Sequence, residues 1–104
     1  MKVRWTEQAF TRLTGIEEYV SADSPSAAKR LVARLVRRAS ALAHSPNIGR
    51  RVPELPGSDL RELIEVQYRI VYRVRPPRVE ILTVFEGHQR FPLADVETTK
   101  PQSR

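Results

Sequence analysis

The sequence predicts an α+β fold in which an N-terminal strand and an α-helical hairpin pack on a mostly antiparallel C-terminal sheet. Two observations support this class. Apolar residues follow helical spacing in two segments of the first half, and Val, Ile, Leu and Tyr gather in three runs of the second half. A length of 104 residues suits one hydrophobic core. We therefore expect a single domain over residues 1–92, followed by a polar tail over residues 93–104.

The first half is expected to form a short strand and two helices. Val3-Arg4-Trp5 reads as the strand, Thr6 caps a helix that begins at Glu7, and Ser24-Pro25 starts a second helix that ends before Ser45-Pro46. Because the connection between the helices is short, they should pack as an antiparallel hairpin. The apolar stripes that would face a core are Ala9, Leu13, Ile16 and Val20 on the first helix, and Ala28, Leu31, Leu35, Ala39 and Leu42 on the second.

The second half is expected to form three consecutive strands, at Leu60–Val66, Tyr68–Val74 and Val79–Phe85. The middle strand alternates an apolar face with a face rich in arginine, so the apolar face should cover the helices. The Pro76-Pro77 pair marks a turn, which makes the three strands an antiparallel meander. Residues 49–58 should wrap the sheet edge, with a short strand near residues 51–55.

The charge predicts an acidic partner. The net charge is +6, and only three of the 18 basic residues are lysines. Nucleic acid, an acidic protein segment or a machine that carries nucleic acid would each satisfy this charge, as would a requirement for solubility alone. The second helix carries a basic stripe that fits either an acidic partner segment or a solvated face, formed by Lys29, Arg30, Arg34, Arg37 and Arg38.

Several classes of protein are excluded by composition. No apolar run approaches the roughly 18 residues of a membrane span, and the N-terminus lacks the apolar stretch of a signal peptide, so we expect a cytoplasmic protein. The chain has no cysteine, and its two histidines, His44 and His88, lie far apart in the sequence. We therefore expect neither a structural metal nor a cofactor.

An ordered set of segments resembles the ParE/RelE superfamily of toxins from bacterial type II toxin–antitoxin modules. The segments are Ala27-Ala28, Leu42 through Ser45-Pro46, Gly49-Arg50, Leu60-Arg61-Glu62-Leu63, Tyr68 through Val74, and Val79 through Val84 before Glu86-Gly87-His88. Together they cover about residues 3–92. The resemblance implies a small bacterial protein that arrests growth when free and is silenced when a cognate antitoxin wraps it.

Two branches of this superfamily share the fold but differ in chemistry. RelE-like members cut messenger RNA on the ribosome, which requires a base, a cation for the phosphorane charge and an acid. The resemblance implies that Arg69, His88 and Arg90 would supply these groups, with Glu54 or Glu86 as a carboxylate partner. ParE-like members poison DNA gyrase and have no catalytic centre of their own. We expect Arg69, His88 and Arg90 to converge on one solvent-accessible rim.

Departures from the nuclease pattern favour the ParE-like branch. Glu62 and Glu65 stand where RelE places basic residues, Gly87 falls near the position of a second catalytic arginine, and no tyrosine follows Tyr72. Carboxylates there would repel a phosphate backbone. A basic nucleic-acid-binding module without toxicity is a further alternative. The arginines expected to contact a target or partner are Arg30, Arg34, Arg37, Arg38, Arg61, Arg69, Arg73 and Arg90.

Simpler structural roles compete with several of these assignments. Arg61, Arg69 and Arg73 would equally suit a solvated sheet face, because sheet faces turned away from a core are commonly charged. His88 follows Gly87 and would fit a turn. Tyr68 and Tyr72 share the apolar face of their strand and are expected in the core rather than in acid catalysis.

Overall fold

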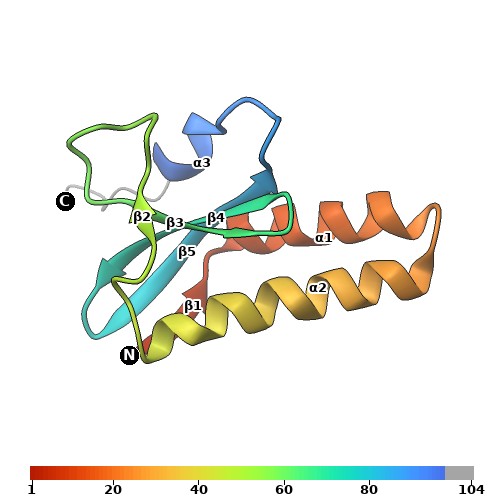
Figure 1. The fold of residues 1–104 in the computed structure, drawn as a ribbon, viewed down its shortest axis with the longest axis horizontal. Helices are drawn as coiled ribbons and strands as arrows, with labels where there is room; N and C mark the ends of the chain where they lie inside the picture. Colours follow the sequence, from red (N-terminus) through yellow and green to blue (C-terminus); the bar gives the residue numbers. More distant parts are fainter. Residues whose placement is uncertain (98–104) are drawn as a thin grey trace.

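The computed structural model describes residues 1–97 and has the predicted α+β architecture. A hairpin of two long helices covers one face of a five-stranded sheet, and a short C-terminal helix lies on the other face (Figure 1). The sheet order is β1-β5-β4-β3-β2, and only the β1–β5 pair is parallel. The elements are β1 (Lys2–Trp5), α1 (Glu7–Ser21), α2 (Pro25–Ser40), a 3₁₀ turn η1 (Ala41–Ala43), β2 (Arg50–Arg51), β3 (Arg61–Glu65), β4 (Tyr68–Arg75), β5 (Arg78–Glu86) and α3 (Leu93–Glu97).

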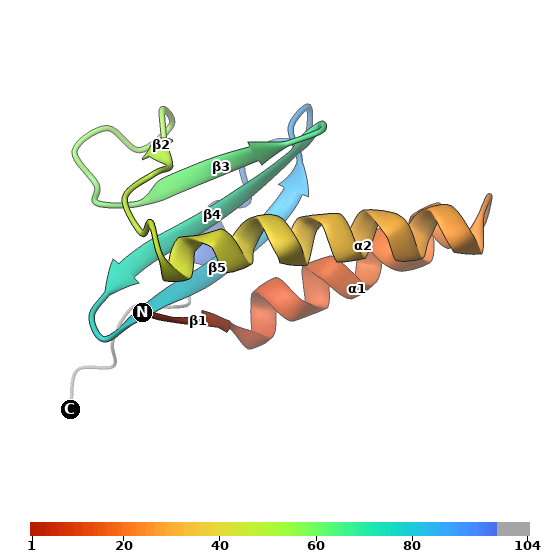
Figure 2. The ribbon, with the colours of Figure 1, turned by 60° about the horizontal axis from the view of Figure 1, so that its bottom comes forward.

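The two predicted helix starts are confirmed by their capping contacts. The Thr6 hydroxyl accepts a hydrogen bond from the backbone N–H of Ala9 at 3.1 Å and donates to the carbonyl of Ile81 at 2.9 Å. This second bond fixes the start of α1 to β5. The Ser24 hydroxyl accepts from the N–H of Ala27 at 3.2 Å, and Pro25 occupies the first turn of α2. The two helices run side by side across the sheet (Figure 2).

The predicted core lies between the helical hairpin and the sheet. Leu35 and Leu42 of the second stripe are fully buried, as are Ile70, Tyr72 and Ile81 of the strands. Ala9 and Leu13 complete the cluster from α1, while Ile16 and Leu31 pack against it in half-buried positions. Tyr68 and Tyr72 are core aromatics as expected, and the Tyr72 hydroxyl accepts a hydrogen bond from the Gly49 N–H at 2.9 Å.

A second hydrophobic cluster lies on the opposite face of the sheet, where the sequence predicts an arginine-studded surface. Val71, Leu82 and Phe85 are buried there beneath residues from the 52–60 segment and the C-terminus: Val52, Leu55, Leu60, Phe91 and Val96. The prediction of a charged face is therefore wrong for this part of β4. The loop between β2 and β3 and the segment after β5 fold back over the strand, so its residues are covered on both sides.

A β-bulge lets β5 supply both clusters. Val71 pairs with Thr83 and Tyr72 pairs with Ile81, which leaves Leu82 as an extra residue on β5. Because of this insertion, Ile81 and Val84 both belong to the helix-side cluster, while Leu82 and Phe85 belong to the second cluster. The continuous apolar run of β5 is thus explained by burial on both faces.

Two boundaries differ from the sequence-based expectation. The edge strand near residues 51–55 is only Arg50–Arg51. Residues 93–97, assigned by composition to the polar tail, form α3 and bury both Asp95 and Val96. The Asp95 carboxylate accepts hydrogen bonds from Arg12 Nε at 2.6 Å and from the Thr83 hydroxyl at 2.8 Å, which ties α3 to α1 and β5. The remaining tail, residues 98–104, lies outside the described residues.

No helix within residues 1–97 is long and apolar enough to cross a membrane.

Candidate functional site

Arg69 occupies the centre of a buried ion-pair network on the sheet face that carries α3. The residue is 8% exposed. Its Nε donates to Glu62 Oε1 at 2.7 Å, and its two terminal nitrogens donate to the two oxygens of Glu54 at 2.8 and 2.6 Å. Glu62 is also buried and accepts from Arg50 through its second oxygen at 2.7 Å. The order Arg50, Glu62, Arg69, Glu54 alternates positive and negative groups across three segments of the chain.

Two aromatic rings complete the surroundings of the Arg69 guanidinium. Its Cζ lies 5.0 Å from the centroid of Phe85 and 5.6 Å from that of Phe91. The two rings meet edge to face, with centroids 5.6 Å apart. This arrangement suits a cation that remains charged while removed from water. Arg69 therefore joins β4 to the β2–β3 loop, through Glu54, and to the segment after β5, through Phe91.

The network also shifts the protonation equilibria of its members. The hydrogen bonds to Glu54 raise the pKa of Arg69 further above its ordinary value, against the opposing effect of burial. The hydrogen bond from Arg69 lowers the pKa of Glu54 below its ordinary value. Both groups are thus charged at neutral pH, and the Glu54 carboxylate occupies the outward-facing side of the guanidinium, where a phosphate would have to bind.

His88 lies in the turn after β5 and is almost entirely in solvent. Its side chain is 91% exposed, and its Nδ1 lies 2.8 Å from the Glu86 carboxylate. That hydrogen bond raises the pKa of His88 and lowers the pKa of Glu86. Arg90 is also exposed and has no ion pair within residues 1–97. The pair of His88 and Glu86 fits the predicted turn, with the Glu86 side chain capping the His88 N–H at 2.7 Å.

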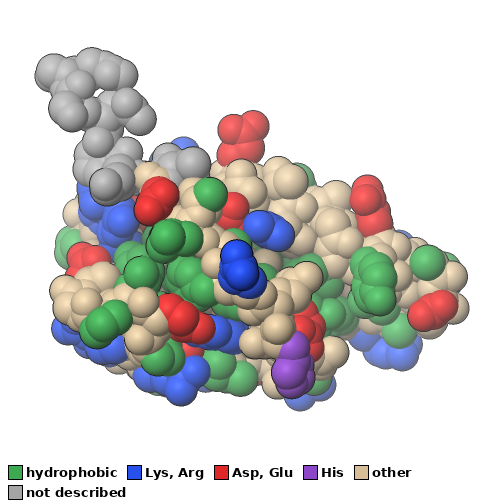
Figure 3. All heavy atoms as spheres, turned by 90° about the horizontal axis from the view of Figure 1, so that it is seen from above, with side chains coloured by type: hydrophobic (Ala, Val, Ile, Leu, Met, Phe, Trp, Pro, Cys, Tyr) green, Lys and Arg blue, Asp and Glu red, His purple; other side chains and the backbone are tan. Residues whose placement is uncertain are grey.

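The predicted convergence of Arg69, His88 and Arg90 on an exposed rim is wrong for Arg69. The turn passes close to the Arg69 stem, because a Cβ built on Gly87 would lie 3.7 Å from Arg69 Cδ. However, the guanidinium itself points into the network with Glu54 and Glu62 rather than towards solvent. Seen from the side of α3, hydrophobic side chains reach the surface among acidic and basic ones (Figure 3). The expected nuclease groups are therefore separated into a buried cation and an exposed turn.

The remaining predicted arginines fall into four environments. Arg61 donates to the Gly49 carbonyl at 2.7 Å and holds the edge of the sheet. Arg73 is half-buried, and its Nη1 has no hydrogen-bond partner among residues 1–97. Arg34 and Arg38 of α2 share the carboxylate of Glu65 on β3.

The other two arginines of the α2 stripe, Arg30 and Arg37, are exposed and have no ion pair among the described residues. They line an open groove of about 560 Å³ between α2 and the β3–β4 turn, together with Leu31, Ala33, Arg34 and Val66. This groove is accordingly basic, and one carboxylate, Glu65, partly neutralises its rim.

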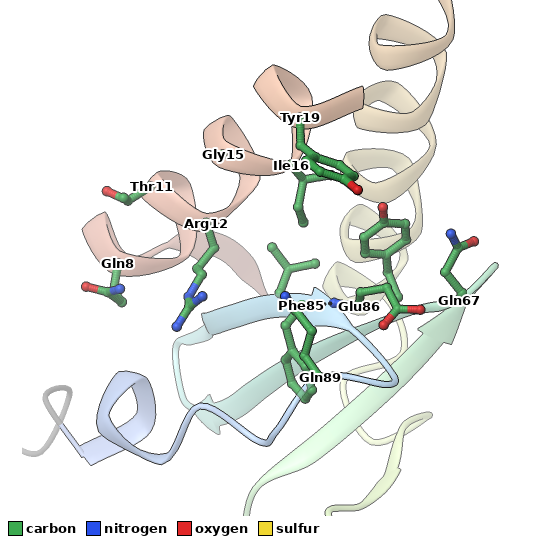
Figure 4. Close-up of a pocket in the computed structure, with 12 residues that line it drawn as sticks. Gln8, Thr11, Arg12, Gly15, Ile16, Tyr19, Gln67, Phe85, Glu86 and Gln89 are labelled. Carbon is green, nitrogen blue, oxygen red and sulfur yellow. Dashed lines mark hydrogen bonds between the residues drawn. The ribbon is translucent and has the colours of Figure 1, made fainter. Parts of the chain in front are cut away.

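A second groove, which the sequence analysis did not predict, runs between α1 and the end of β5. Its volume is about 770 Å³. Figure 4 shows Gln8, Thr11, Arg12 and Tyr19 along α1, opposite Phe85, Glu86, Gln89 and Gln67. Ile16, Tyr68 and Val84 also line it. Gly15 faces open space, since a Cβ at this position would meet nothing within 4 Å. A glycine inside an otherwise regular helix is the one local signal in the sequence that could have pointed to this groove.

The β5 edge beside this groove is not paired along its full length. β1 pairs with β5 only from Arg78 to Ile81, after which the chain turns into α1. Within residues 1–97 no strand pairs with the outer edge of β5 beyond Ile81. Tyr19 is 83% exposed at the far end of the groove, and burial raises the pKa of the neighbouring Tyr68. The groove thus combines an apolar floor, a polar rim and an available strand edge, which are features of a peptide-binding surface.

Comparison with known proteins assigns the chain to a family. The model of the family described as "ParE toxin of type II toxin-antitoxin system, parDE" matches residues 3–91. The chain belongs to the ParE toxin family.

The similar proteins are toxins by name or belong to a toxin–antitoxin system. The chain is 42% identical to the candidate toxin Y4kP of Sinorhizobium fredii over 95 residues, which cover 88% of this chain and 93% of the relative. It is 39% identical to Toxin RelE2 of Caulobacter vibrioides over 84 residues, covering 80% of this chain and 91% of that protein. A chain of the chromosomal ParDE TA system from P. aeruginosa superposes with a TM-score of 0.70 at 27% identity, covering 83% of this chain and 95% of that one.

Proposed function

We propose that this member of the ParE toxin family arrests growth in the cytoplasm by poisoning DNA gyrase, without catalysis of its own, and that a cognate antitoxin neutralises it. The observation that carries the proposal is the state of Arg69. The residue is 8% exposed, and its guanidinium donates hydrogen bonds to both Glu54 and Glu62. A cation held in this way stabilises the fold and is not available to a phosphorane.

The nuclease alternative would require several groups to act on one phosphate. A phosphate could reach Arg69 only by displacing the bidentate Glu54 carboxylate, and the nearby Glu62 would remain as a buried negative charge. Among residues 1–97, His88 has one polar partner, Glu86, and its side chain is 91% exposed, so no enclosing wall would hold a substrate hydroxyl against it. The RelE2 name of one relative keeps ribosome-dependent mRNA cleavage as the alternative to be tested.

The groove beside α1 supports antitoxin binding along the sheet edge. Its floor offers buried apolar contacts from Ile16, Val84 and Phe85, and its rim offers neutral polar groups. An amphipathic antitoxin segment would bury its apolar side there and could pair with the outer edge of β5. The α2 groove, by contrast, is lined by three arginines and by no aromatic side chain. We therefore place the antitoxin in the α1 groove rather than over the basic helix.

Induction of the protein alone, followed by separate readouts on DNA and on translation, tests the proposed target. Cleaved DNA–gyrase complexes and loss of supercoiling by purified gyrase are expected, with translation unaffected at early times. His88→Ala is the informative variant, because this side chain is 91% exposed and its loss leaves the fold intact. Its toxicity should equal that of the wild type. A loss on the order of 10²–10⁴-fold in codon-positioned mRNA cleavage would instead establish the nuclease alternative.

A further inference from the structure

The outer side of α2 is a strongly positive surface whose side chains take no part in the hydrophobic core. The helix contains five basic residues and no aspartate or glutamate over Pro25–Ser40. Its apolar residues Ala28, Leu35 and Ala39 are buried on the side that faces α1 and the sheet. In Figure 2 the helix lies at the front of the molecule with its outer side uncovered. Four of its five basic residues are arginines.

Only part of this charge is neutralised within the protein. Glu65 accepts from Arg34 Nε at 2.6 Å and lies 3.4 Å from Arg38 Nε, so one carboxylate serves two guanidinium groups. Arg30 and Arg37 have no ion pair among residues 1–97. Both line the open groove that ends at Val66 of the β3–β4 turn. Two unpaired guanidinium groups therefore face outward on either side of Arg34.

The spacing of these arginines matches a row of phosphates. Positions 30, 34 and 37 lie on one side of a helix, and the rise of about 1.5 Å per residue separates the first from the last by about 10 Å. Measured along the axis of a duplex, that distance spans about three phosphates of one strand, at a rise of ~3.4 Å for each. Arginine presents planar paired donors to a phosphate, whereas lysine presents a single point charge.

The chemistry of the surface favours duplex DNA over its competitors. Single-stranded nucleic acid is bound through aromatic platforms on which bases stack, and α2 contains no Phe, Trp or Tyr. A protein partner would favour large aromatic anchors, whereas the apolar side chains that line this groove are the half-buried Leu31 and the exposed Ala33 and Val66. The α1 groove, with Ile16, Val84 and Phe85, is the better protein-binding surface.

We propose that Arg30, Arg34 and Arg37 of α2 contact the phosphate backbone of duplex DNA, without reading its sequence. The inference rests on the proposed function, because gyrase holds a DNA duplex and a toxin that poisons it could bind enzyme and DNA together. In that arrangement the α1 groove and the α2 face bind different partners. The antitoxin occupies the first, and the DNA backbone occupies the second.

Fluorescence anisotropy tests this proposal. The purified full chain is titrated into a labelled DNA duplex of about 20 base pairs over a range of salt concentrations. Arg30→Gln/Arg37→Gln removes the two unpaired guanidinium groups without touching the Glu65 pairs. We expect at least a tenfold loss of affinity at low salt. The slope of log K against log salt should fall by about 1.8, which corresponds to two phosphate contacts at ~0.9 each.

The matched control is Arg4→Gln/Arg75→Gln, which removes two exposed arginines outside α2 that have no ion pair within residues 1–97. Its affinity for the duplex should stay within about twofold of the wild type, since only contacts with phosphate enter the slope. An equal loss in both variants would show that net charge alone attracts DNA and would overturn the proposal. A loss of antitoxin affinity in the α2 variant, with DNA binding unchanged, would assign the face to the antitoxin and would also overturn it.

A gyrase assay in parallel separates this inference from the proposed function. If wild-type toxin produces cleaved gyrase–DNA complexes while binding no duplex by itself, the α2 inference fails and the function stands. If the chain binds duplex through α2 but leaves gyrase unaffected, the DNA contact stands and the function fails. A single-stranded RNA of matched length is the third arm, and tighter binding to it than to the duplex would contradict the choice of DNA.

Discussion

Arg69→Ala is expected to destabilise the protein by about 3–5 kcal/mol, because it removes one partner of a buried charge pair and leaves the other uncompensated. Glu62 is 1% exposed and would keep a contact only with Arg50, whose side chain is 59% exposed. The substitution also removes the cation from beside the Phe85 and Phe91 rings, where it contributes on the order of 0.5–2 kcal/mol within the same total. A domain of this size is typically stable by about 5–15 kcal/mol, so the variant should remain folded but marginal.

Urea unfolding followed by the fluorescence of Trp5, the one tryptophan, measures this cost. Arg90→Ala is the matched control, since it removes an exposed arginine near the same face and should change stability by less than about 0.5 kcal/mol. A double-mutant cycle with Glu62→Gln isolates the pair and should give a coupling of at least about 1 kcal/mol. Equal stabilities of Arg69→Ala and Arg90→Ala would refute the structural role of Arg69 and reopen its assignment to a phosphate.

Three further outcomes follow from the packing, the ion pairs and the α1 groove. Leu35→Ala should cost about 2–5 kcal/mol, because Leu35 is fully buried between α2 and the sheet, and a melting transition unshifted from the wild type would contradict the core assignment. The pKa of Glu54 is lowered on folding, so its pair with Arg69 stabilises the folded state fully at pH values above the ordinary pKa of 4.5, and this stability is lost as the pH falls through the folded pKa. Glu54→Gln should therefore weaken the dependence of the unfolding free energy on pH in that acidic range. Gly15→Leu should fill the α1 groove and reduce antitoxin affinity at least tenfold. Gly15→Ala should instead raise the stability of the helix by up to about 1 kcal/mol. Unchanged antitoxin binding by the leucine variant would show that the antitoxin binds elsewhere.

The helix-side half of the fold was predictable because each signal was local. Thr6 and Ser24-Pro25 fix the two helix starts, and the three- and four-residue steps of apolar residues fix the faces that meet the sheet. The second cluster was harder to predict because its members come from separate segments. Val52, Leu60 and Val96 are single apolar residues among polar neighbours, and no period in the sequence connects them. They meet only after a loop and a five-residue helix fold over β4.

The same limit explains why the candidate site was only partly predicted. The resemblance identified Arg69 as a residue of interest, and alternation correctly placed it on the face away from the hairpin. Its burial depends on Glu54, Phe85 and Phe91, which lie 15, 16 and 22 positions along the chain from it. A pattern confined to one strand cannot report such contacts. The α1 groove likewise requires a helix and a strand end to be placed in space before it exists.

The carboxylates that depart from the nuclease pattern now have specific partners, and these partners bear on function. Glu62 binds Arg69 and Arg50, and Glu65 binds Arg34 and Arg38. Each carboxylate therefore pairs with two arginines and offsets one of the two positive charges that they would otherwise present to RNA. Glu62 turns the strand-centre cation into a packing element, whereas Glu65 leaves the outermost α2 arginines unpaired. Arg69 thus stabilises the fold, while the outer face of α2 and the α1 groove stay open for binding, and this separation is what the proposed non-catalytic mode of action requires.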